Sequence, residues 1–385
     1  MTGHAGEYLT ALVIFLLLAG WFTVERWRHE RNLDRIPLRI HVNGTRGKSS
    51  VTRLIAAGLR AGGLTVVAKT TGSVAMVILP DGGELPMPRR GPANIRELVP
   101  FVALAAGLGA GAIVVECMAV RPDAQRFSAE KLLRAHIGVI TTVRPDHEEV
   151  TGEGPGVARA LAGTVPRGGT LVTTPAARKA LAAAGVPPAG QVRLADPGTL
   201  AAADLQGFGF EVFAENVALA LAVCEQAGVD RHTALRGMRA ASPDPGNVAA
   251  GALAVVGRPV AFVNALAAND PESTLILWRR YVGAGPVVVL LNCRPDRKYR
   301  TVQLAAALAA HHPGPYLVTG DGAFARRQLL DRGVAAGGIR VIGRPDGPAA
   351  LAGALGGEGP LTVFAAGNVQ GMEGFLNWRP AGVTS

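Results

Sequence analysis

The sequence predicts an α/β protein with one N-terminal transmembrane helix, a P-loop domain with a mostly parallel sheet and a smaller C-terminal α/β domain. Three observations support this fold class. An uncharged, mostly apolar run covers residues 9–24. After it, short apolar stretches alternate with stretches of helical periodicity, as in mostly parallel sheets covered by helices. Residues 39–55 read as a strand, a glycine-rich turn and a helix, the pattern of a phosphate-binding loop.

The first element is a transmembrane helix over residues 8–24, long enough to cross a bilayer core of about 30 Å. No Lys or Arg precedes the run and no small-residue cleavage site follows it, which argues against a signal peptide. Residues 25–37 are expected to form a basic juxtamembrane linker. Its arginines predict a single-pass protein of the plasma membrane, with the N-terminus outside and the catalytic domains cytoplasmic.

The second element is the phosphate-binding loop that opens the domain over residues 38–248. Gly44 and Gly47 allow a tight turn, Lys48 supplies a positive charge, and the hydroxyl of Ser49 can bind Mg²⁺ at the helix N-terminus. Only two residues separate the glycines, so the usual P-loop spacing is not met. The alternative is a glycine-rich turn with a surface lysine, but the apolar residues on both sides favour the phosphate loop.

A second strand over residues 65–69 leads into a small polar loop that contains Thr70, Thr71 and Gly72. Its hydroxyls could meet a metal or a substrate carboxylate, and the alternative is an ordinary glycine turn. Further on, Arg89 and Arg90 lie in a basic loop that is either a polyanion contact or solvated surface.

Two later strands deliver polar side chains to the same edge of the sheet. The apolar run 111–116 ends in Glu116, and the run 137–143 leads to His147. A carboxylate at this edge suits Mg²⁺, and the histidine could bind the metal or orient a phosphate. The alternative for His147 is a lone histidine on a surface loop.

Composition sets broader limits. Cys117, Cys224 and Cys293 are far apart and lack metal-site spacing, so we expect buried thiols in a reducing compartment. The chain has 39 basic and 29 acidic residues, a net charge of +10. This charge is compatible with anionic lipid, nucleic acid or an acidic substrate and does not decide between them.

The chain resembles the Mur-ligase superfamily, and within it the ligase subunit of poly-gamma-glutamate synthase. The resemblance rests on blocks in family order: 42–50, 69–72, 116–123, 137–140 with Asp146 and His147, 242–246, 268–274, 292–297 and 367–368. A leading membrane segment is also typical of this subfamily.

The resemblance implies ATP-dependent amide ligation with Mg²⁺. A glutamate carboxylate would be activated as an acyl phosphate, and the amino group of another glutamate would displace phosphate. It implies that Lys48, Glu116 and His147 are catalytic and that Ser49, Glu116 and His147 surround the metal. Predicted ATP-binding residues are Asn43, Gly44, Thr45, Arg46, Gly47, Lys48, Ser49, Ser50, Asn216, Arg294, Asp296 and Arg297. Predicted substrate-binding residues are Lys69, Thr70, Thr71, Gly72, Arg89, Arg90, Asn269 and Asp270.

Some positions leave alternatives open or depart from the family. Asn269 and Asp270 could instead cap a helix, and Asp296 with Arg297 could be a surface ion pair. The family's carbamylated lysine has no counterpart in residues 157–163, so a second metal site is in doubt. A new alternation of strands and helices after residue 248 predicts the C-terminal domain over residues 249–385.

The expected partners are glutamate, poly-gamma-glutamate, and the polytopic and exported subunits of a synthase complex, with no nucleic acid and a possible homo-oligomer. The helix over residues 9–24 would dock on a polytopic subunit at Ala19 and Gly20. A membrane-tethered P-loop ATPase that drives export or assembly without ligation is the alternative function. A soluble folylpolyglutamate-type ligase fits the fold but gives no reason for the transmembrane helix.

Overall fold

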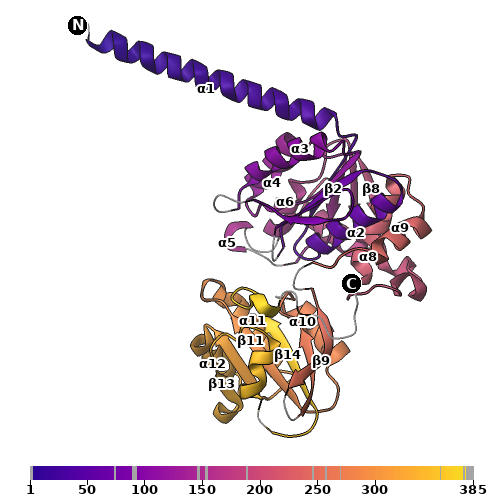
Figure 1. Ribbon diagram of the computed structural model, residues 1–385, viewed down its shortest axis with the longest axis vertical. Coiled ribbons are helices and arrows are strands. Elements are labelled where there is room, and N and C mark those ends of the chain that lie inside the picture. Colours follow the sequence, from indigo (N-terminus) through magenta and orange to yellow (C-terminus); the bar gives the residue numbers. More distant parts are fainter. Residues whose placement is uncertain are drawn as a thin grey trace. The chain divides into compact units, whose positions relative to one another are not determined.

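The computed structural model describes residues 3–72, 75–88, 93–144, 148–151, 155–187, 190–244, 247–255, 258–268, 270–355, 357–375 and 378. The chain forms two compact units (Figure 1). Unit 1 comprises Met1–Gly207 and Val212–Ser242, and unit 2 comprises Phe208–Glu211 and Pro243–Ser385.

The described part of unit 1 contains an eight-stranded sheet in the order β4-β3-β2-β5-β1-β6-β7-β8. β3 and β4 pair antiparallel at one edge, and the other pairings are parallel. The central strands are buried on both faces, which explains the apolar sequences of β5 and β6, whereas β1, equally buried, also carries Arg39 and His41. The strands are β1 Leu38–Asn43, β2 Val66–Thr70, β3 Met76–Ile78, β4 Glu84–Pro86, β5 Ala112–Glu116, β6 Ile137–Ile140, β7 Thr170–Thr173 and β8 Gln191–Leu194.

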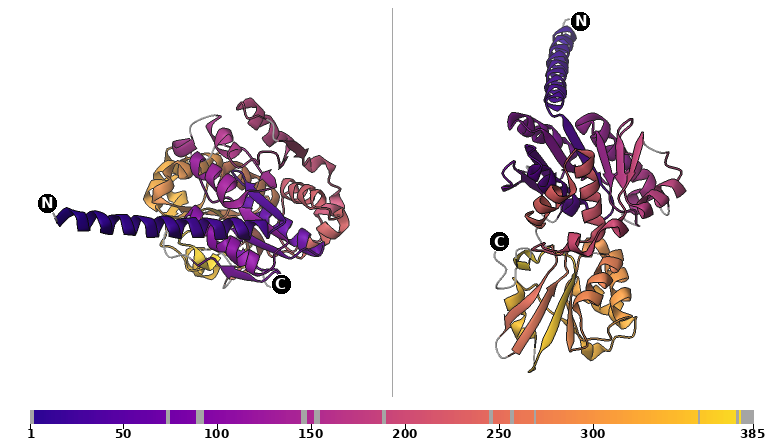
Figure 2. Two further views of the ribbon diagram at one scale, coloured as in Figure 1. Left: turned by 90° about the horizontal axis from the view of Figure 1, so that it is seen from above. Right: turned by 90° about the vertical axis from the view of Figure 1, so that its right-hand side faces the viewer.

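Helices cover both faces of this sheet (Figures 1 and 2). α2 follows the phosphate-binding loop and buries Val51, Leu54, Ile55 and Leu59, as the helical spacing predicted. The helices are α1 Gly3–Asp34, α2 Lys48–Ala61, α3 Leu98–Gly107, α4 Pro122–Phe127, α5 Glu148–Thr151, α6 Gly156–Ala162, α7 Pro175–Ala183, α8 Ala214–Gln226 and α9 Arg231–Arg239. A 3₁₀ turn, η1 Ile95–Glu97, precedes α3, and a π-helical turn, η2 Ser128–Leu133, follows α4.

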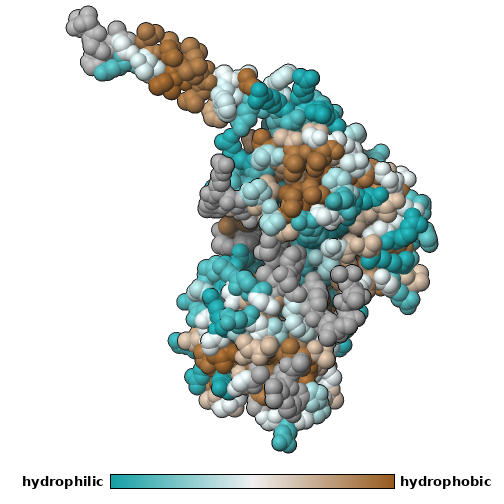
Figure 3. All heavy atoms as spheres, in the orientation of Figure 1, coloured by the Kyte–Doolittle hydropathy of each residue, from teal (hydrophilic) through white to brown (hydrophobic). Residues whose placement is uncertain are grey.

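α1 is longer than the predicted span of residues 8–24. Its first part exposes apolar side chains (Figure 3), and this helix is long and apolar enough to cross a membrane. The helix then continues to Asp34, through residues 25–34 of the stretch 25–37 that was expected to be a linker. Leu33 and Ile36 have no exposed surface and belong to the core beneath α3. The basic stretch is therefore part of the folded unit.

A buried arginine joins the end of α1 to β1. The Nη1 atom of Arg39 donates to the carbonyls of Leu33 and Ile36 at 2.9 and 2.8 Å. Its Nε atom donates to the carbonyls of Leu133 and Arg134 at 2.9 and 3.1 Å. One guanidinium thus satisfies carbonyl groups at the ends of α1 and η2, groups that helices leave without internal partners.

Unit 2 contains a six-stranded sheet in the described residues, with the order β13-β12-β11-β14-β10-β9. Only the pairing of β9 with β10 is antiparallel within this sheet. The strands are β9 Ala249–Val255, β10 Arg258–Asn264, β11 Val287–Cys293, β12 Tyr316–Gly320, β13 Ile339–Val341 and β14 Leu361–Gly367, and the helices are α10 Pro271–Tyr281, α11 Lys298–Ala309 and α12 Gly322–Leu330. Short 3₁₀ turns include η5 Pro295–Arg297 and η7 Pro348–Ala354.

His41 lies in the middle of β1 and is 1% exposed. Neither ring nitrogen has a hydrogen-bond partner in the described part of the chain. Because burial penalises the charged ring, it lowers the pKa of His41 to about 4. The ring is therefore neutral at pH 7.

This histidine predicts a loss of stability in acid. The ring takes up a proton near pH 6.5 in the unfolded chain but only near pH 4 in the fold. The free energy of unfolding should therefore fall by about 3 kcal/mol as the pH drops from 6.5 to 4. We expect His41→Met to lose this part of the pH dependence in urea titrations of the detergent-solubilised chain. His311→Gln, at an exposed histidine, is the control, and equal pH slopes for His41→Met and the natural protein would contradict the prediction.

Candidate functional site

The phosphate-binding loop joins β1 to α2 through two glycines in left-handed conformations, with φ of 135° at Gly44 and 82° at Gly47. Both also approach neighbours closely. A Cβ on Gly44 would lie 2.0 Å from Thr141 Oγ1, and one on Gly47 would lie 2.5 Å from Asn216 Oδ1. Any other residue at either position would therefore strain the backbone and displace a neighbour.

The loop backbone is held by two threonines that follow β6. The Oγ1 of Thr141 donates to the carbonyl of Arg46 at 2.5 Å. The Oγ1 of Thr142 accepts from the Arg46 amide at 2.9 Å, and its carbonyl accepts from the Thr45 amide at 3.0 Å. β6 ends at Ile140, earlier than the predicted strand 137–143, because these threonines turn to the loop. Sequence reasoning missed their role, although a pair of threonines at the end of a buried strand was a visible signal.

Asn43, predicted to bind ATP, supports the loop from inside the fold. Its Oδ1 accepts from the Gly44 amide at 2.8 Å, and its Nδ2 donates to Gln125 at 2.8 Å and Thr164 at 3.2 Å. Lys48 begins α2, and its ammonium donates to the carbonyl of Gly44 at 2.7 Å. The half-buried lysine therefore folds over the loop, where its ammonium group can bind an anion.

Glu116 ends β5 and is the centre of the site in unit 1. Its side chain is 3% exposed. One carboxylate oxygen, Oε2, accepts from the Ser49 hydroxyl at 2.9 Å and from the Thr71 amide at 2.6 Å. The carboxylate thus brings together the start of α2 and the loop after β2. His147, the third predicted metal ligand, lies outside the described residues.

These groups fit Mg²⁺. A serine hydroxyl and a carboxylate are oxygen ligands, and Mg²⁺ is commonly held by one or two carboxylates together with waters and substrate phosphates. The described residues contain no group of three or more His, Cys, Asp or Glu that could hold a metal ion. Ser49 and Glu116 are therefore the residues here that would hold the ion.

The residues predicted to bind substrate after β2 divide into two groups. Thr71 and Gly72 lie at the loop, with Thr71 bonded to Glu116 and Gly72 exposed. Thr70 is buried, and its hydroxyl has no partner in the part of the chain that is described. Lys69 is wholly buried, and its ammonium lies 3.2 Å from a carboxylate oxygen of Glu97 rather than at the surface. Arg89 and Arg90 lie outside the described residues.

Asn216 lies in the first turn of α8 and is 7% exposed. The position of its side-chain oxygen against Gly47 places this amide beside the phosphate-binding loop. The structure therefore brings Asn216 together with Lys48 and Ser49, although well over a hundred residues separate them in the chain.

In unit 2, the carboxyl ends of β11, β12 and β14 meet around Asn292. Its Nδ2 donates to the carbonyls of Asn368 and Gln370 at 2.5 and 3.1 Å. A Cβ on Gly320 would lie 2.0 Å from the carbonyl of Cys293, and one on Gly367 would lie 2.1 Å from that of Asn292. The strand ends are therefore packed backbone to backbone.

Predicted site residues of unit 2 follow these strands. Arg294 donates two hydrogen bonds to Asp296, from Nε at 2.8 Å and from Nη2 at 2.5 Å. Arg297 is half-buried, and burial lowers its pKa, with nearby arginines adding to the effect. Asp270 caps α10 by accepting from the Ser273 amide at 3.0 Å, so the capping alternative is observed. Asn269 lies outside the described residues.

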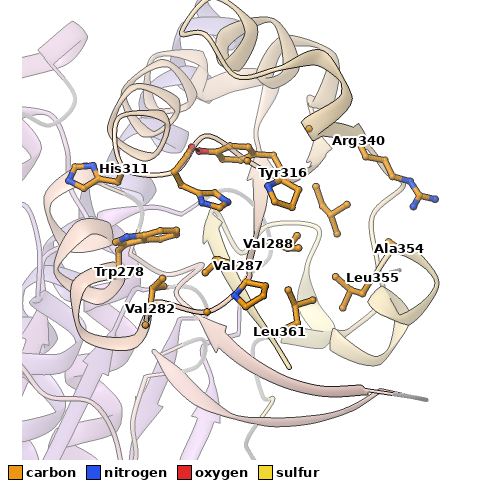
Figure 4. A pocket seen from close by; sticks show the side chains of 18 of the residues that line it. Trp278, Val282, Val287, Val288, His311, Tyr316, Arg340, Ala354, Leu355 and Leu361 are labelled. Atoms are coloured by element: carbon orange, nitrogen blue, oxygen red, sulfur yellow. Dashed lines mark hydrogen bonds between the residues drawn. The ribbon is translucent and has the colours of Figure 1, made fainter. Parts of the chain in front are cut away.

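A cavity of about 760 Å³ lies at the opposite, amino end of the unit 2 strands (Figure 4). Trp278, His312 and Tyr316 line it, and the His312 ring centre is 5.5 Å from that of each aromatic neighbour. None of the predicted site residues borders this cavity. It is therefore separate from the edge that carries Asn292 and Arg294.

The three thiols are buried and free, as expected. Burial raises the pKa of Cys117 and Cys293 to about 11 and that of Cys224 to about 12. They remain neutral at pH 7, including Cys117 next to Glu116, and do not supply a thiolate.

Comparison with known proteins shows which proteins this chain is similar to. The family described as "Poly-gamma-glutamate synthase CapB C-terminal domain" matches residues 252–378. "Capsule biosynthesis protein CapB" of Bacillus anthracis is 41% identical over 305 residues, covering 76% of this chain and 64% of that protein. "PGA synthase CapB" of Bacillus subtilis (strain 168) is 39% identical over 290 residues, covering 73% of this chain and 74% of that protein.

Solved structures show the same fold at low sequence identity. The folylpolyglutamate synthase of Mycobacterium tuberculosis, complexed with ADP, has a TM-score of 0.65 and 17% identity, covering 91% of this chain and 92% of that one. The bifunctional folylpolyglutamate synthase/dihydrofolate synthase of Yersinia pestis, complexed with AMPPNP and Mn ion, has a TM-score of 0.65 and 17% identity, covering 92% and 96%. The chain therefore shares the fold of these folylpolyglutamate synthases and belongs to the CapB family.

Proposed function

We propose that this chain is the ATP-dependent amide ligase of poly-gamma-glutamate synthesis, acting at the cytoplasmic face of the membrane. The observation that carries the proposal is the shared oxygen of Glu116, which draws Ser49 and Thr71 to the phosphate-binding loop. This arrangement suits a nucleotide with a divalent ion. The relatives named above, one of them a PGA synthase, point to glutamate as the substrate.

In the proposed first step, an oxygen of a glutamate or chain-end carboxylate attacks the γ-phosphorus of ATP, and the bond to the β-phosphate oxygen breaks to release ADP. Lys48 and the amides of the loop neutralise charge on the transferred phosphoryl group. Glu116 and Ser49 would hold Mg²⁺, which supplies charge stabilisation at the phosphates when bound.

In the second step, the amino group of a glutamate attacks the carbonyl carbon of the acyl phosphate. The C–O bond to phosphate breaks, phosphate leaves, and the attacking nitrogen loses a proton. Positioning of the two reactants supplies much of the acceleration in such transfers. Thr70, Thr71, Gly72, Arg89, Arg90, Asn269 and Asp270 remain proposed substrate contacts, and Asn216, Arg294, Asp296 and Arg297 remain proposed nucleotide contacts.

α1 gives a reason for placing this chemistry at a membrane. Its exposed apolar part would span the bilayer once, with the arginines of its second half on the cytoplasmic side. Polyglutamate gains one negative charge per residue and cannot cross hydrocarbon unaided, so synthesis beside an exporting partner would be useful. Docking of the helix on polytopic and exported subunits is part of the proposal, as is a possible homo-oligomer.

A ligase is distinguished from the alternative, a tethered ATPase, by the fate of a carboxylate oxygen. Detergent-solubilised protein or membranes with the partner subunits would receive ATP and glutamate labelled with ¹⁸O in its carboxylates. We expect one labelled oxygen in each phosphate released and phosphate release that depends on glutamate. Unlabelled phosphate, released equally without glutamate, would indicate an ATPase and contradict the ligase.

Loss of the loop lysine tests the phosphate site. We expect Lys48→Ala to lower phosphoryl transfer by at least a hundredfold, the usual cost of removing one group that stabilises transition-state charge. Folding should be unchanged, because the half-buried side chain packs little. Lys179→Ala, at an exposed lysine of α7, is the matched control. Undiminished ¹⁸O transfer by Lys48→Ala would show that Lys48 and its loop do not act on the transferred phosphate.

Loss of the central carboxylate tests the metal site. Glu116→Gln keeps the shape but removes the charge, and we expect the Mg²⁺ concentration for half-maximal activity to rise at least tenfold. Ser49→Ala should shift it in the same direction, and His147→Ala tests the third proposed ligand. The control is Glu130→Gln at an exposed glutamate. Unchanged Mg²⁺ titrations in the three site variants would exclude these residues as metal ligands.

A further inference from the structure

Unit 1 contains a buried ion pair close to the proposed metal site. The ammonium of Lys69, in β2, lies 3.2 Å from Glu97 Oε2 in η1. The lysine side chain has no exposed surface, and the glutamate is 11% exposed. Burying both charges carries a desolvation cost that their attraction often does not exceed, so stability alone is a weak reason for such a pair.

The pair lies close to the two chain segments that leave β2 and β5 and form the site. Thr71, two residues after Lys69, donates its amide to Glu116 at 2.6 Å. The Lys69 ammonium also lies 3.9 Å from the sulfur of Met118, two residues after Glu116. One ammonium group thus contacts the chain leaving β5 while its own strand carries the amide that holds Glu116.

Lys69 cannot touch the reacting groups directly. In the parallel pairing of β2 with β5, Lys69 is opposite Val115, so both side chains leave the same face of the sheet. Glu116, the next residue, projects from the other face, where Ser49 begins α2. Lys69 can therefore set the position of Glu116 through the backbone of β2 and β5 rather than by side-chain contact.

Glu97 is itself fixed. Its other carboxylate oxygen, Oε1, accepts from the Asn94 amide at 3.3 Å, and the Asn94 side chain accepts from the Arg96 amide at 2.9 Å. This capping box closes η1 on itself and gives the carboxylate a defined position before α3 begins.

We propose that Glu97 and Lys69 are positioning residues: their buried ion pair holds the exits of β2 and β5 so that Thr71 and Glu116 keep the geometry needed for the divalent ion. The assignment rests on the proposed function of the site. It replaces a direct substrate contact of Lys69 with an indirect role, and it adds Glu97, which sequence reasoning did not select.

The test measures Mn²⁺ binding in the presence of ADP, by the electron paramagnetic resonance signal of free Mn²⁺, on the detergent-solubilised full chain. For Glu97→Gln we expect binding weakened about tenfold to a hundredfold, the usual effect of losing a group that orients a metal ligand. Binding of ADP in the presence of EDTA should stay unchanged, because the loop is held separately by Thr141 and Thr142.

A double variant separates positioning from plain stability. Lys69→Met with Glu97→Gln removes both charges, and the glutamine oxygen can still accept from the Asn94 amide, so the melting temperature should be close to that of the natural protein. We expect its Mn²⁺ affinity to stay low. Arg96→Ala is the matched control, since it removes only the exposed pair of η1 with Glu25 and should leave Mn²⁺ binding unchanged.

Natural Mn²⁺ affinity in the stable double variant would overturn the proposal, because the pair would then serve only folding. The proposal would also be overturned if the double variant lost Mn²⁺ binding and lost ADP binding in the presence of EDTA to the same extent. The proposed ligase activity is tested separately. Unlabelled phosphate in the ¹⁸O experiment with the natural protein would contradict the ligase activity and would not bear on the positioning role. The Mn²⁺ comparison decides the positioning role in either case.

Discussion

The phosphate-binding loop depends on two threonines that follow β6. Thr141 donates its hydroxyl to the carbonyl of Arg46, and Thr142 accepts from the amides of Thr45 and Arg46, so partners from outside the loop hold its backbone. The approach of Thr141 is so close that only glycine fits at position 44. Because the loop is already ordered, phosphate binding would not carry the conformational-entropy cost of ordering it.

Local patterns predicted the elements well and side-chain partners poorly. β5 and β6 were visible as apolar runs, and Glu116 stood out because a charged residue ends the first of them. The bracing by Thr141 and the pairing of Lys69 with Glu97 depend on strand order and on η1, which no short stretch reveals. The end of α1 was missed for a related reason: basic composition suggested a linker, whereas tertiary contacts keep it helical.

Three buried polar side chains lie on one face of the unit 1 sheet. Arg39, His41 and Lys69 are all buried there, together with Val115, against α3, η1, η2 and the end of α1. Arg39 and Lys69 have oxygen partners, and His41 avoids the need for a charged partner by staying neutral. The opposite face, beneath α2, presents Glu116 to the loop. The sheet thus separates groups that hold the fold from groups that face the proposed chemistry.

The guanidinium of Arg39 fixes the end of α1 to the chain that enters β1. α1 continues unbroken to Asp34 and is hydrogen-bonded there through the carbonyls of Leu33 and Ile36, so α1 itself, rather than a separate linker, joins its apolar part to the folded unit. Ten residues of helix separate the end of the proposed span from Asp34, a rigid offset of roughly 15 Å at the rise of an α-helix. In the proposed membrane-bound ligase, that offset would set the distance between the lipid surface and the site at which glutamate is added.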